Sequence, residues 1–269
     1  LIKPGKSHLE VTEEIEAKVK ELKGMLAFPV QISINNIAAH YNPLIGKDFK
    51  FKEDDVCKLD LGVQVNGAIG DTAVTIDLGD NSKLVKASEK ALKSALEIIK
   101  PGIKVFEIGK LIEETILQEG FQPIRNLGGH GLGLYEIHTS PSMPNFDNKD
   151  NTKLKEGQTI AIEPFASTGD GFVVNGQLSE IYELINKKNI RNISARRIMN
   201  FVDENFKTLP FSKRNLIKEF SKTEIVFGLN ELTKNNILHE FNILVEKNKN
   251  ALISQAEHTV IVGKQITTL

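Results

Sequence analysis

The chain has 269 residues, of which 40% are hydrophobic, so it can bury a full core as one large domain or two small ones. Its 34 Lys plus Arg residues nearly balance its 35 Asp plus Glu residues, which gives no reason to expect nucleic acid, DNA included, or a charged membrane as the main partner. A single cysteine, Cys57, excludes an internal disulfide framework, and the sequence has neither a signal-peptide pattern nor an apolar run of membrane-spanning length, so we expect a cytoplasmic protein.

The first predicted elements are an amphipathic helix over residues 11–22 and a strand over residues 27–34. Two β-rich runs follow in residues 55–79. They are joined at Asn66-Gly67, a dipeptide that suits a two-residue type I′ turn because both of its residues can take a positive φ. The pattern therefore predicts a long β-hairpin.

Two carboxylates are expected to converge on one face of this hairpin. With Asn66-Gly67 as the turn, Gly62 faces Asp71, and Asp60 lies diagonally across from Asp71 on the same face. Carboxylates this close repel each other unless positive charge lies between them, which points to one or two divalent cations. A surface hairpin with two solvated aspartates is the alternative that these residues leave open.

The elements after the hairpin are mainly helical. Ser82 can cap a helix over residues 83–99, and a second helix is expected over residues 105–119. Strand character returns at residues 251–262.

Residues 186–235 have a different composition, with short helical pieces and eleven Lys plus Arg against five Asp plus Glu, a net charge of +6. Ser194 can cap one helix there, and Ser212 another that buries Ile217. We expect a small helical insertion subdomain at 186–235 within a main domain formed by 1–185 and 236–269. Its basic surface could face RNA or simply be solvated.

The chain also repeats itself with a period near 100 residues. The motif IKPG, followed by a helix, occurs at residues 2–5 and again at 99–102. Further along, FKEDDVCKLD lines up with LKEGQTIAIE, which places Asp60 over Glu163. These similarities predict two halves related by a pseudo-twofold axis, with these carboxylates at equivalent places.

Three histidines and two further acids are candidates for chemistry. His130 lies in the glycine-rich segment NLGGHGLGLYEIH, and His138 follows at an even spacing, so both imidazoles would share a face if the segment were extended. His40 is a third candidate with a weak individual signal. Glu163 and Glu257 are single acids in apolar, strand-like runs, where burial is costly without a cation or another partner. His8 and His239 appear in polar helical surroundings and are assigned no role.

Four carboxylates and one imidazole form an oxygen-rich set that suits two divalent ions sharing bridging carboxylates. A structural zinc site would need thiolates that one cysteine cannot supply. The sequence contains no G-x-S-x-G, G-x-G-x-x-G or Walker A pattern, so a serine hydrolase, a dinucleotide enzyme and an NTPase are disfavoured.

The ordered set of candidate residues resembles that of the methionine aminopeptidases of the pita-bread metallopeptidase family. The phrases AAHY at His40 and EHT at Glu257, together with the helical insertion between Glu163 and Glu257, resemble the type 2, archaeal branch. The resemblance covers nearly the whole chain. It implies an α+β fold with duplicated halves, in which a curved antiparallel sheet is covered by helices. Family members usually have an additional N-terminal helical stretch, and this chain begins at Leu1, so a truncated or processed form is expected.

The resemblance also implies roles for individual residues. Asp60 and Asp71 would bind one metal, Asp71 and Glu257 would bridge to a second, and His130 and Glu163 would complete the second site. A hydroxide between the metals would attack the first peptide carbonyl, with Glu163 as proton shuttle. His138 would stabilise the oxyanion, and His40 would contact the scissile amide and help the leaving amine. Phe28 and Ile137 match positions that line the methionine pocket, although both could equally be core residues.

The activity implied is removal of N-terminal methionine from nascent polypeptides by a monomer, with transient ribosome contact as a further expectation. The ligand set accepts Co, Mn, Fe or Zn and does not select among them. An Xaa-Pro peptidase of the same fold is the nearest alternative, disfavoured by the short N-terminal region and by the insertion after Glu163. A non-catalytic pita-bread protein that binds RNA or proteins is the second alternative.

Overall fold

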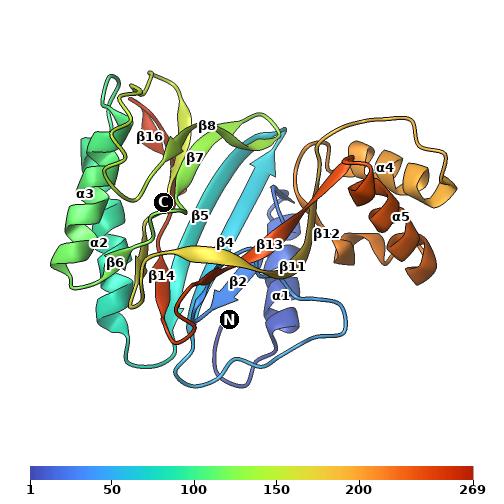
Figure 1. Ribbon diagram of the computed structural model, residues 1–269, viewed down its shortest axis with the longest axis horizontal. Helices are drawn as coiled ribbons and strands as arrows, with labels where there is room; N and C mark the ends of the chain where they lie inside the picture. Colours follow the sequence, from blue (N-terminus) through green and yellow to red (C-terminus); the bar gives the residue numbers. More distant parts are fainter. Residues whose placement is uncertain (269) are drawn as a thin grey trace.

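The computed structural model describes residues 1–268 as one mixed arrangement of helices and antiparallel sheets (Figure 1). The helices are α1 (His8–Glu21), α2 (Ser82–Ile98), α3 (Val105–Gln118), α4 (Ile193–Asn205) and α5 (Lys222–Lys234), with a 3-10 helix η1 (Lys213–Leu216). Among the helices of residues 1–268, none has the length and apolar character that a membrane span requires.

Every strand pair in the described chain is antiparallel, as the family resemblance implied. One sheet joins β1, β4, β2 and β5; a second has the order β12-β11-β13-β3; a third has the order β16-β15-β9-β7-β8; and a fourth has the order β14-β10-β6. The strands are β1 (Met25–Leu26), β2 (Gln31–Ile34), β3 (Ile37–Ala39), β4 (Val56–Val65), β5 (Ala68–Asp77), β6 (Gln122–Pro123), β7 (Gly129–Gly133), β8 (Glu136–Met143), β9 (Thr159–Ile162), β10 (Phe165–Ser167), β11 (Val173–Leu184), β12 (Phe211–Ser212), β13 (Leu238–Glu246), β14 (Ile253–Gln255), β15 (His258–Ile261) and β16 (Gln265–Ile266).

The predicted hairpin is confirmed as β4 and β5, two ten-residue strands joined at Asn66-Gly67. Both turn residues have positive φ, 51° at Asn66 and 86° at Gly67, as a type I′ turn requires. Gly62 pairs with Asp71, so the register matches the sequence prediction.

The repeat in the sequence corresponds to a repeat in backbone contacts. Gly5 N donates to Phe51 O at 2.8 Å, and Gly102 N donates to Leu154 O at the same distance. Both glycines have φ near +85°, at 84° and 87°, in the region that favours glycine. Each contact joins the segment before a helix to the segment before a strand: α1 and β4 in the first half, α3 and β9 in the second. The two halves therefore have the same local structure.

Helices cover the outer side of the sheets. In Figure 1, α2 and α3 lie side by side on one flank and α1 lies across the sheet from them. The main core lies between α2, α3 and the strands, and includes Leu84, Ile108, Ile112, Ile116 and Ile160. A separate cluster joins α1 to β2 and β4 through Val11, Ile15 and Ile32.

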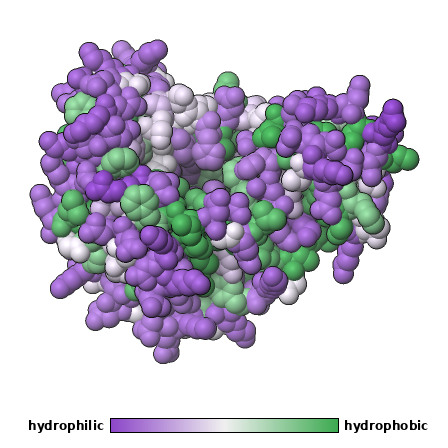
Figure 2. Space-filling model, viewed as in Figure 1, coloured by the Kyte–Doolittle hydropathy of each residue, from purple (hydrophilic) through white to green (hydrophobic). Residues whose placement is uncertain are grey.

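Residues between β11 and β13 form the lobe that contains α4 and α5 at one end of the molecule (Figure 1). It has its own apolar cluster, in which Ile198 and Val202 of α4 pack with Leu229 of α5. Figure 2 shows hydrophilic residues over most of this face of the molecule and hydrophobic residues on this lobe, where Ile193 and Phe227 are exposed. The assignment of 186–235 as a subdomain remains a prediction.

Two helix caps differ from those predicted from the sequence. The cap of α2 is Asn81 rather than Ser82, because the Asp77 carboxylate at the end of β5 accepts the Asn81 backbone N–H at 2.6 Å and fixes the chain one residue earlier. The cap of α4 is Asn192 rather than Ser194, since Asn192 Oδ1 accepts from the Ala195 backbone N–H at 3.0 Å.

The segment after Ser212 also differs from the prediction. Ser212 caps only the short η1 helix, and the chain turns after Leu216, so Ile217 is exposed rather than buried. The third helix of this region, α5, begins after a different cap, Ser221, whose side chain accepts from the Glu224 backbone N–H.

His8 lies in apolar rather than polar surroundings. Its side chain is buried, and its ring stacks on Tyr41 with ring centroids 5.4 Å apart and contacts Phe49 at 4.7 Å. Burial lowers the pKa of His8 to about 4, so the imidazole is neutral at pH 7. Its aromatic partners lie far from it in the sequence, which is why helical periodicity alone did not reveal this environment.

Candidate metal centre and substrate cavity

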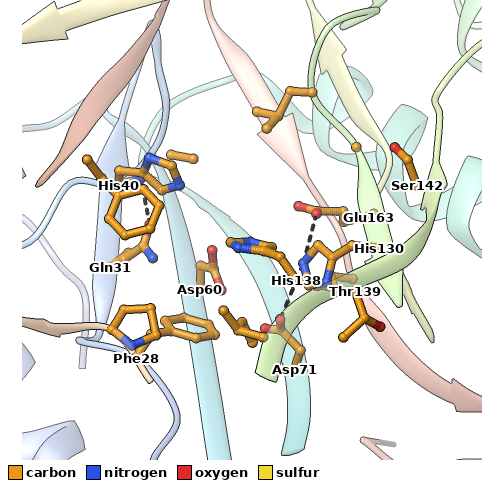
Figure 3. Close-up of a pocket in the computed structure, with 18 of the residues that line it drawn as sticks. Phe28, Gln31, His40, Asp60, Asp71, His130, His138, Thr139, Ser142 and Glu163 are labelled. Atoms are coloured by element: carbon orange, nitrogen blue, oxygen red, sulfur yellow. Dashed lines mark hydrogen bonds and ion pairs between the residues drawn. The ribbon is translucent and has the colours of Figure 1, made fainter. Parts of the chain in front are cut away.

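A cavity of about 410 Å³ lies between the β4–β5 hairpin, the β7–β8 hairpin, and strands β11 and β13. Figure 3 shows the candidate side chains pointing into it from separate elements: Asp60 from β4, Asp71 from β5, and His130 and His138 from β7 and β8. Glu163, which follows β9, and Glu257, between β14 and β15, also line it. The chain therefore brings together all five residues that the sequence predicted as metal ligands.

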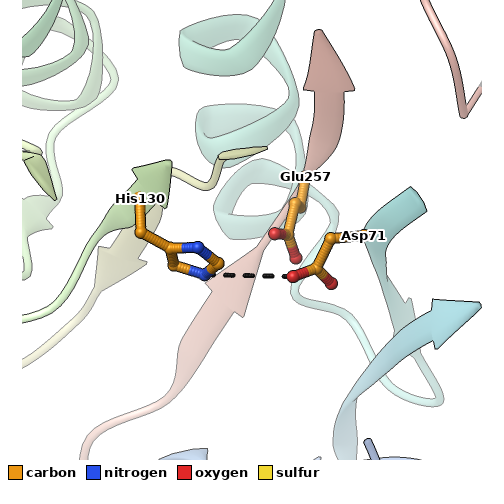
Figure 4. A group of neighbouring side chains, drawn as sticks. All are labelled: Asp71, His130 and Glu257. Carbon is orange, nitrogen blue, oxygen red and sulfur yellow. Dashed lines mark ion pairs between the residues drawn. The ribbon is translucent and has the colours of Figure 1, made fainter. Parts of the chain in front are cut away.

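Asp71, His130 and Glu257 form a close group, whose ligand atoms all lie within 4.8 Å of one another (Figure 4). His130 Nε2 lies 3.9 Å from Asp71 Oδ2 and 3.7 Å from Glu163 Oε1. These separations are too long for hydrogen bonds. They match the separations of atoms that bind the same metal ion. With metal–ligand bonds of about 2.0–2.2 Å, angles near 90–110° place neighbouring ligand atoms about 3 to 3.5 Å apart, and wider angles place them up to about 4 Å apart.

Backbone and hydroxyl contacts hold the acids in place. Thr259 Oγ1 accepts from the Asp71 backbone N–H at 2.7 Å and donates to the Asp71 carbonyl at 2.8 Å. Nearby, Ala73 pairs with Glu257 in an isolated antiparallel bridge. These contacts join β5 to the chain around β15, so residues that are almost 190 positions apart in the sequence meet on one floor.

Burial shifts the pKa values of these acids upward. It raises the pKa of Asp71 to about 7 and that of Glu163 to about 8, with the charge of Asp71 adding to the shift at Glu163. Burial, and then the neighbouring carboxylates, raise the pKa values of Asp60 and Glu257 well above their usual range. Ionised together without a cation, these groups would repel one another at a high free-energy cost.

The His130 imidazole directs a nitrogen lone pair into the space that the carboxylates surround. Its Nδ1 lies 3.2 Å from the Gly131 carbonyl, which can only accept, so Nδ1 carries the proton and Nε2 faces Asp71 and Glu163 as an acceptor. Burial lowers the pKa of His130 to about 4, which keeps the ring neutral. Neutral imidazole is the form that binds metals.

Two carboxylate oxygens support the same interpretation. Asp60 Oδ1 and Asp71 Oδ1 are buried and have no hydrogen-bond partner among residues 1–268. Buried carboxylate oxygens are normally paired or bound to a cation. With acceptor atoms facing one another and only one imidazole among them, the residues present fit a site for divalent cations.

His130 and His138 meet, but not in the way their spacing predicted. The segment is a hairpin rather than one extended strand, with His130 on β7 and His138 on β8. Their rings lie edge to face with centroids 4.5 Å apart. Burial lowers the pKa of His138 to about 3, with His130 and His40 contributing, so His138 is a neutral group beside the acids.

His40 lies across the cavity and is held at both its backbone and its ring. Its φ is 63°, and its backbone N–H donates to Gln31 Oε1 at 2.5 Å. Its Nδ1 lies 2.9 Å from the Asn242 carbonyl and must donate to it, so Nε2 is left as an acceptor. Burial lowers the pKa of His40, and the ring is neutral.

Phe28 and Ile137 are both buried and both line the apolar side of the cavity. They belong to one apolar cluster with Leu209. A Cβ at Gly62 would stand 2.2 Å from Phe28 Cε1, so the missing side chain at Gly62 makes the space that the Phe28 ring occupies. The glycine opposite Asp71 thus serves the apolar pocket as well as the acidic floor.

Sequence reasoning missed two glutamines at the site. Gln255 is buried, and its Nε2 donates to Glu163 Oε2 at 3.3 Å and lies 3.5 Å from Glu257 Oε2. Its position two residues before Glu257 places it on the same face of a strand, a signal that was present in the sequence. Gln31 pairs in register with Asp60, and its side chain accepts the His40 backbone N–H. No sequence pattern indicated this contact with His40.

The fold and this carboxylate-histidine cluster define a metallopeptidase of the pita-bread type. Residues 1–199 match the model of metallopeptidase family M24. Over 272 residues the sequence is 43% identical to the methionine aminopeptidase of Methanocaldococcus jannaschii, covering 100% of this chain and 91% of that protein. Identity to the enzyme of Archaeoglobus fulgidus is 46% over 270 residues, with 99% and 91% coverage. The chain therefore belongs to metallopeptidase family M24, in the type 2 methionine aminopeptidase branch.

Solved structures agree on the fold. A thermophilic Arx1 superposes with a TM-score of 0.83 at 18% identity, covering 99% of this chain and 84% of the other, which shows the fold alone. The methionine aminopeptidase of Thermotoga maritima matches 98% of this chain and 86% of its own, with a TM-score of 0.69 at 25% identity. The prolidase of Pyrococcus furiosus, at 28% identity and a TM-score of 0.52, matches only 61% of this chain and 49% of its own.

Proposed function

We propose that this chain is a metallo-aminopeptidase that hydrolyses the bond after an N-terminal methionine. The observation that carries the proposal is the buried convergence of Asp71, His130 and Glu257, with Asp60 and Glu163, on the floor of a cavity that has one apolar side. The chain's place among the methionine aminopeptidases gives the reaction and the substrate class.

The ligand assignment is the one that the family resemblance implies, and the lining of the cavity is compatible with it. Asp60 and Asp71 would hold one cation, Asp71 and Glu257 would bridge to a second, and His130 and Glu163 would complete the second site. Bound divalent cations would lower the pKa of a water between them toward neutrality and polarise the substrate carbonyl.

The chain's own residues would handle the protons. Glu163 would take a proton from the attacking water and pass it to the leaving amine. His138, neutral and beside the acids, would donate its ring N–H to the oxyanion. His40 has Nε2 free as an acceptor, so it would orient the scissile amide by accepting its N–H.

The apolar side of the cavity would hold the methionine side chain. Phe28 and Ile137 offer a buried, mainly hydrocarbon surface that suits one flexible thioether chain. Because the acids line the same cavity, the scissile carbonyl would lie between them and this apolar surface.

The test is turnover by protein reconstituted separately with Co, Mn, Fe or Zn. We expect release of free methionine from Met-Ala-Ser and little cleavage of an Ala-Pro peptide. Faster cleavage of the prolyl substrate would favour an Xaa-Pro peptidase instead. Metal-replete protein with no peptidase activity but firm RNA binding would replace the proposal with a non-catalytic binding protein.

The partners proposed are N-terminal peptides of nascent proteins in the cytoplasm, with the enzyme acting as a monomer. The net charge of +6 in residues 186–235 supports transient contact with ribosomal RNA. Co-sedimentation with ribosomes at increasing salt tests this contact. Binding that does not weaken with salt would argue against a charge-driven contact.

A further inference from the structure

The end of the α4–α5 lobe nearest the catalytic site reaches the substrate cavity. Pro210 lines the cavity, and Leu209 is buried in the apolar cluster with Phe28 and Ile137. Both residues lie in the short connection between α4 and β12, outside the hairpins that carry the acids. The lobe therefore supplies part of the wall around the proposed methionine pocket.

This connection is held to the rest of the site at Tyr135, in the turn between β7 and β8. Thr208 Oγ1 donates to the Tyr135 carbonyl, and Lys207 Nζ lies 3.8 Å from the centroid of the Tyr135 ring, a cation–π contact. In Figure 1 the tips of the β4–β5 and β7–β8 hairpins lie beside the loop that returns from the lobe.

Tyr135 is in turn fixed to the tip of the β4–β5 hairpin. Its backbone N–H donates to the Gly67 carbonyl at 2.9 Å. A Cβ at Gly67 would stand 2.4 Å from Tyr135 Cε2, so the ring lies directly on the glycine of the turn. Tyr135 itself has a φ of 58°, a conformation rarely adopted by a tyrosine and maintained here by contacts on both sides.

We propose that Tyr135 is a positioning residue for methionine recognition: it holds residues 207–210 against the tip of the β4–β5 hairpin and thereby sets Leu209 and Pro210 as the outer wall of the methionine pocket. This inference rests on the proposed function for its substrate. Its geometric content, the attachment of residues 207–210 through Tyr135, does not depend on it.

The variant Tyr135→Ala tests the proposal in the metal-replete, full-length protein. The variant keeps the backbone hydrogen bonds of Tyr135 but removes the ring that contacts Lys207 and Gly67, so Leu209 and Pro210 are held less firmly. Displacement of this wall weakens side-chain binding but leaves the acids in place, so KM for Met-Ala-Ser should rise about tenfold or more while kcat changes by less than about threefold. Discrimination between Met-Ala-Ser and Phe-Ala-Ser should fall, because the pocket opens. Tyr135→Phe keeps the ring and should restore the wild-type values.

A second readout is amide hydrogen exchange in residues 206–212. Exchange there should speed up in Tyr135→Ala and, less strongly, in Lys207→Gln. Lys207→Gln removes the cation but keeps the tyrosine, so it provides the test if Tyr135→Ala folds poorly. Lys222→Ala, at an exposed lysine of α5, is the matched control and should change neither exchange nor KM.

Unchanged KM and unchanged exchange in Tyr135→Ala would overturn the proposal, as would a fall in kcat accompanied by loss of bound metal, because that would mean a general disruption of the site. If the wild-type protein does not release methionine, the proposed function fails. Exchange in residues 206–212 would still support or overturn the attachment through Tyr135.

Discussion

Replacing Gly62 by alanine tests whether one position of the hairpin serves both sides of the cavity. The new Cβ would stand 2.2 Å from Phe28 Cε1 and 2.6 Å from Phe28 Cδ1, distances that real Cβ atoms do not show. The ring cannot simply turn aside, because Phe28 is 6% exposed and packs with Ile137 and Leu209.

The size of the effect follows from this overpacking. An extra methyl group in a filled core costs about 1–3 kcal/mol in the free energy of unfolding. In a protein of this size, each kcal/mol corresponds to about 2–4 °C in Tm. The same displacement moves Phe28 into the proposed methionine pocket, so KM for Met-Ala-Ser should also rise, by about tenfold for a contact of this size.

The assay is urea unfolding of the metal-free protein together with steady-state kinetics of the metal-loaded protein. Gly70→Ala is the matched control on the same hairpin, because its Cβ would meet only Thr268 Cγ2, at 3.3 Å, and the Val63 carbonyl at 4.0 Å. The double variant Gly62→Ala with Phe28→Leu should recover much of the lost stability. Wild-type stability and KM in Gly62→Ala would refute the packing argument.

Three further variants address the remaining parts of the account. Glu163→Gln should lower kcat by about 10² or more with the fold intact, since Glu163 is the proposed proton shuttle; unchanged turnover would exclude Glu163 from proton transfer. Gln31→Ala removes the acceptor of the His40 backbone N–H and should lower kcat/KM about tenfold at constant metal content, whereas full activity would show that His40 needs no such support. His8→Phe should flatten the pH dependence of stability in urea unfolding. In the wild type the folded-state pKa of His8 is about 4 against 6.5 in the unfolded chain, so unfolding takes up a proton between these values, and about 3 kcal/mol of stability present above pH 6.5 is lost as the pH falls to 4. Parallel curves for the two proteins would contradict the buried, neutral His8.

The sequence predicted the parts of the site that depend on local rules. The Asn66-Gly67 turn sets the β4–β5 register residue by residue, so the pairing of Gly62 with Asp71 followed from the turn alone. The repeat likewise placed Gly5 and Gly102 at equivalent positions, as their backbone contacts show. That Asp60, Asp71, His130, Glu163 and Glu257 belong together came from the family resemblance.

What the sequence did not reveal depends on contacts between distant segments. His130 and His138 meet across a hairpin whose turn, at Leu134 and Tyr135, carries none of the usual turn dipeptides. The aromatic environment of His8 comes from residues more than thirty positions away. The helix caps were missed because asparagines one or two residues earlier, Asn81 and Asn192, compete with the serines as helix starts.

Anomalous scattering from crystals of the protein loaded with a divalent transition metal tests the two-metal site most directly. We expect two anomalous peaks on the cavity floor, one between Asp60 and Asp71 and one near His130 Nε2 and Glu163, each about 2.0–2.2 Å from its ligand atoms. Metal-loaded crystals with no peak on that floor, or with peaks bound only at other residues, would contradict it.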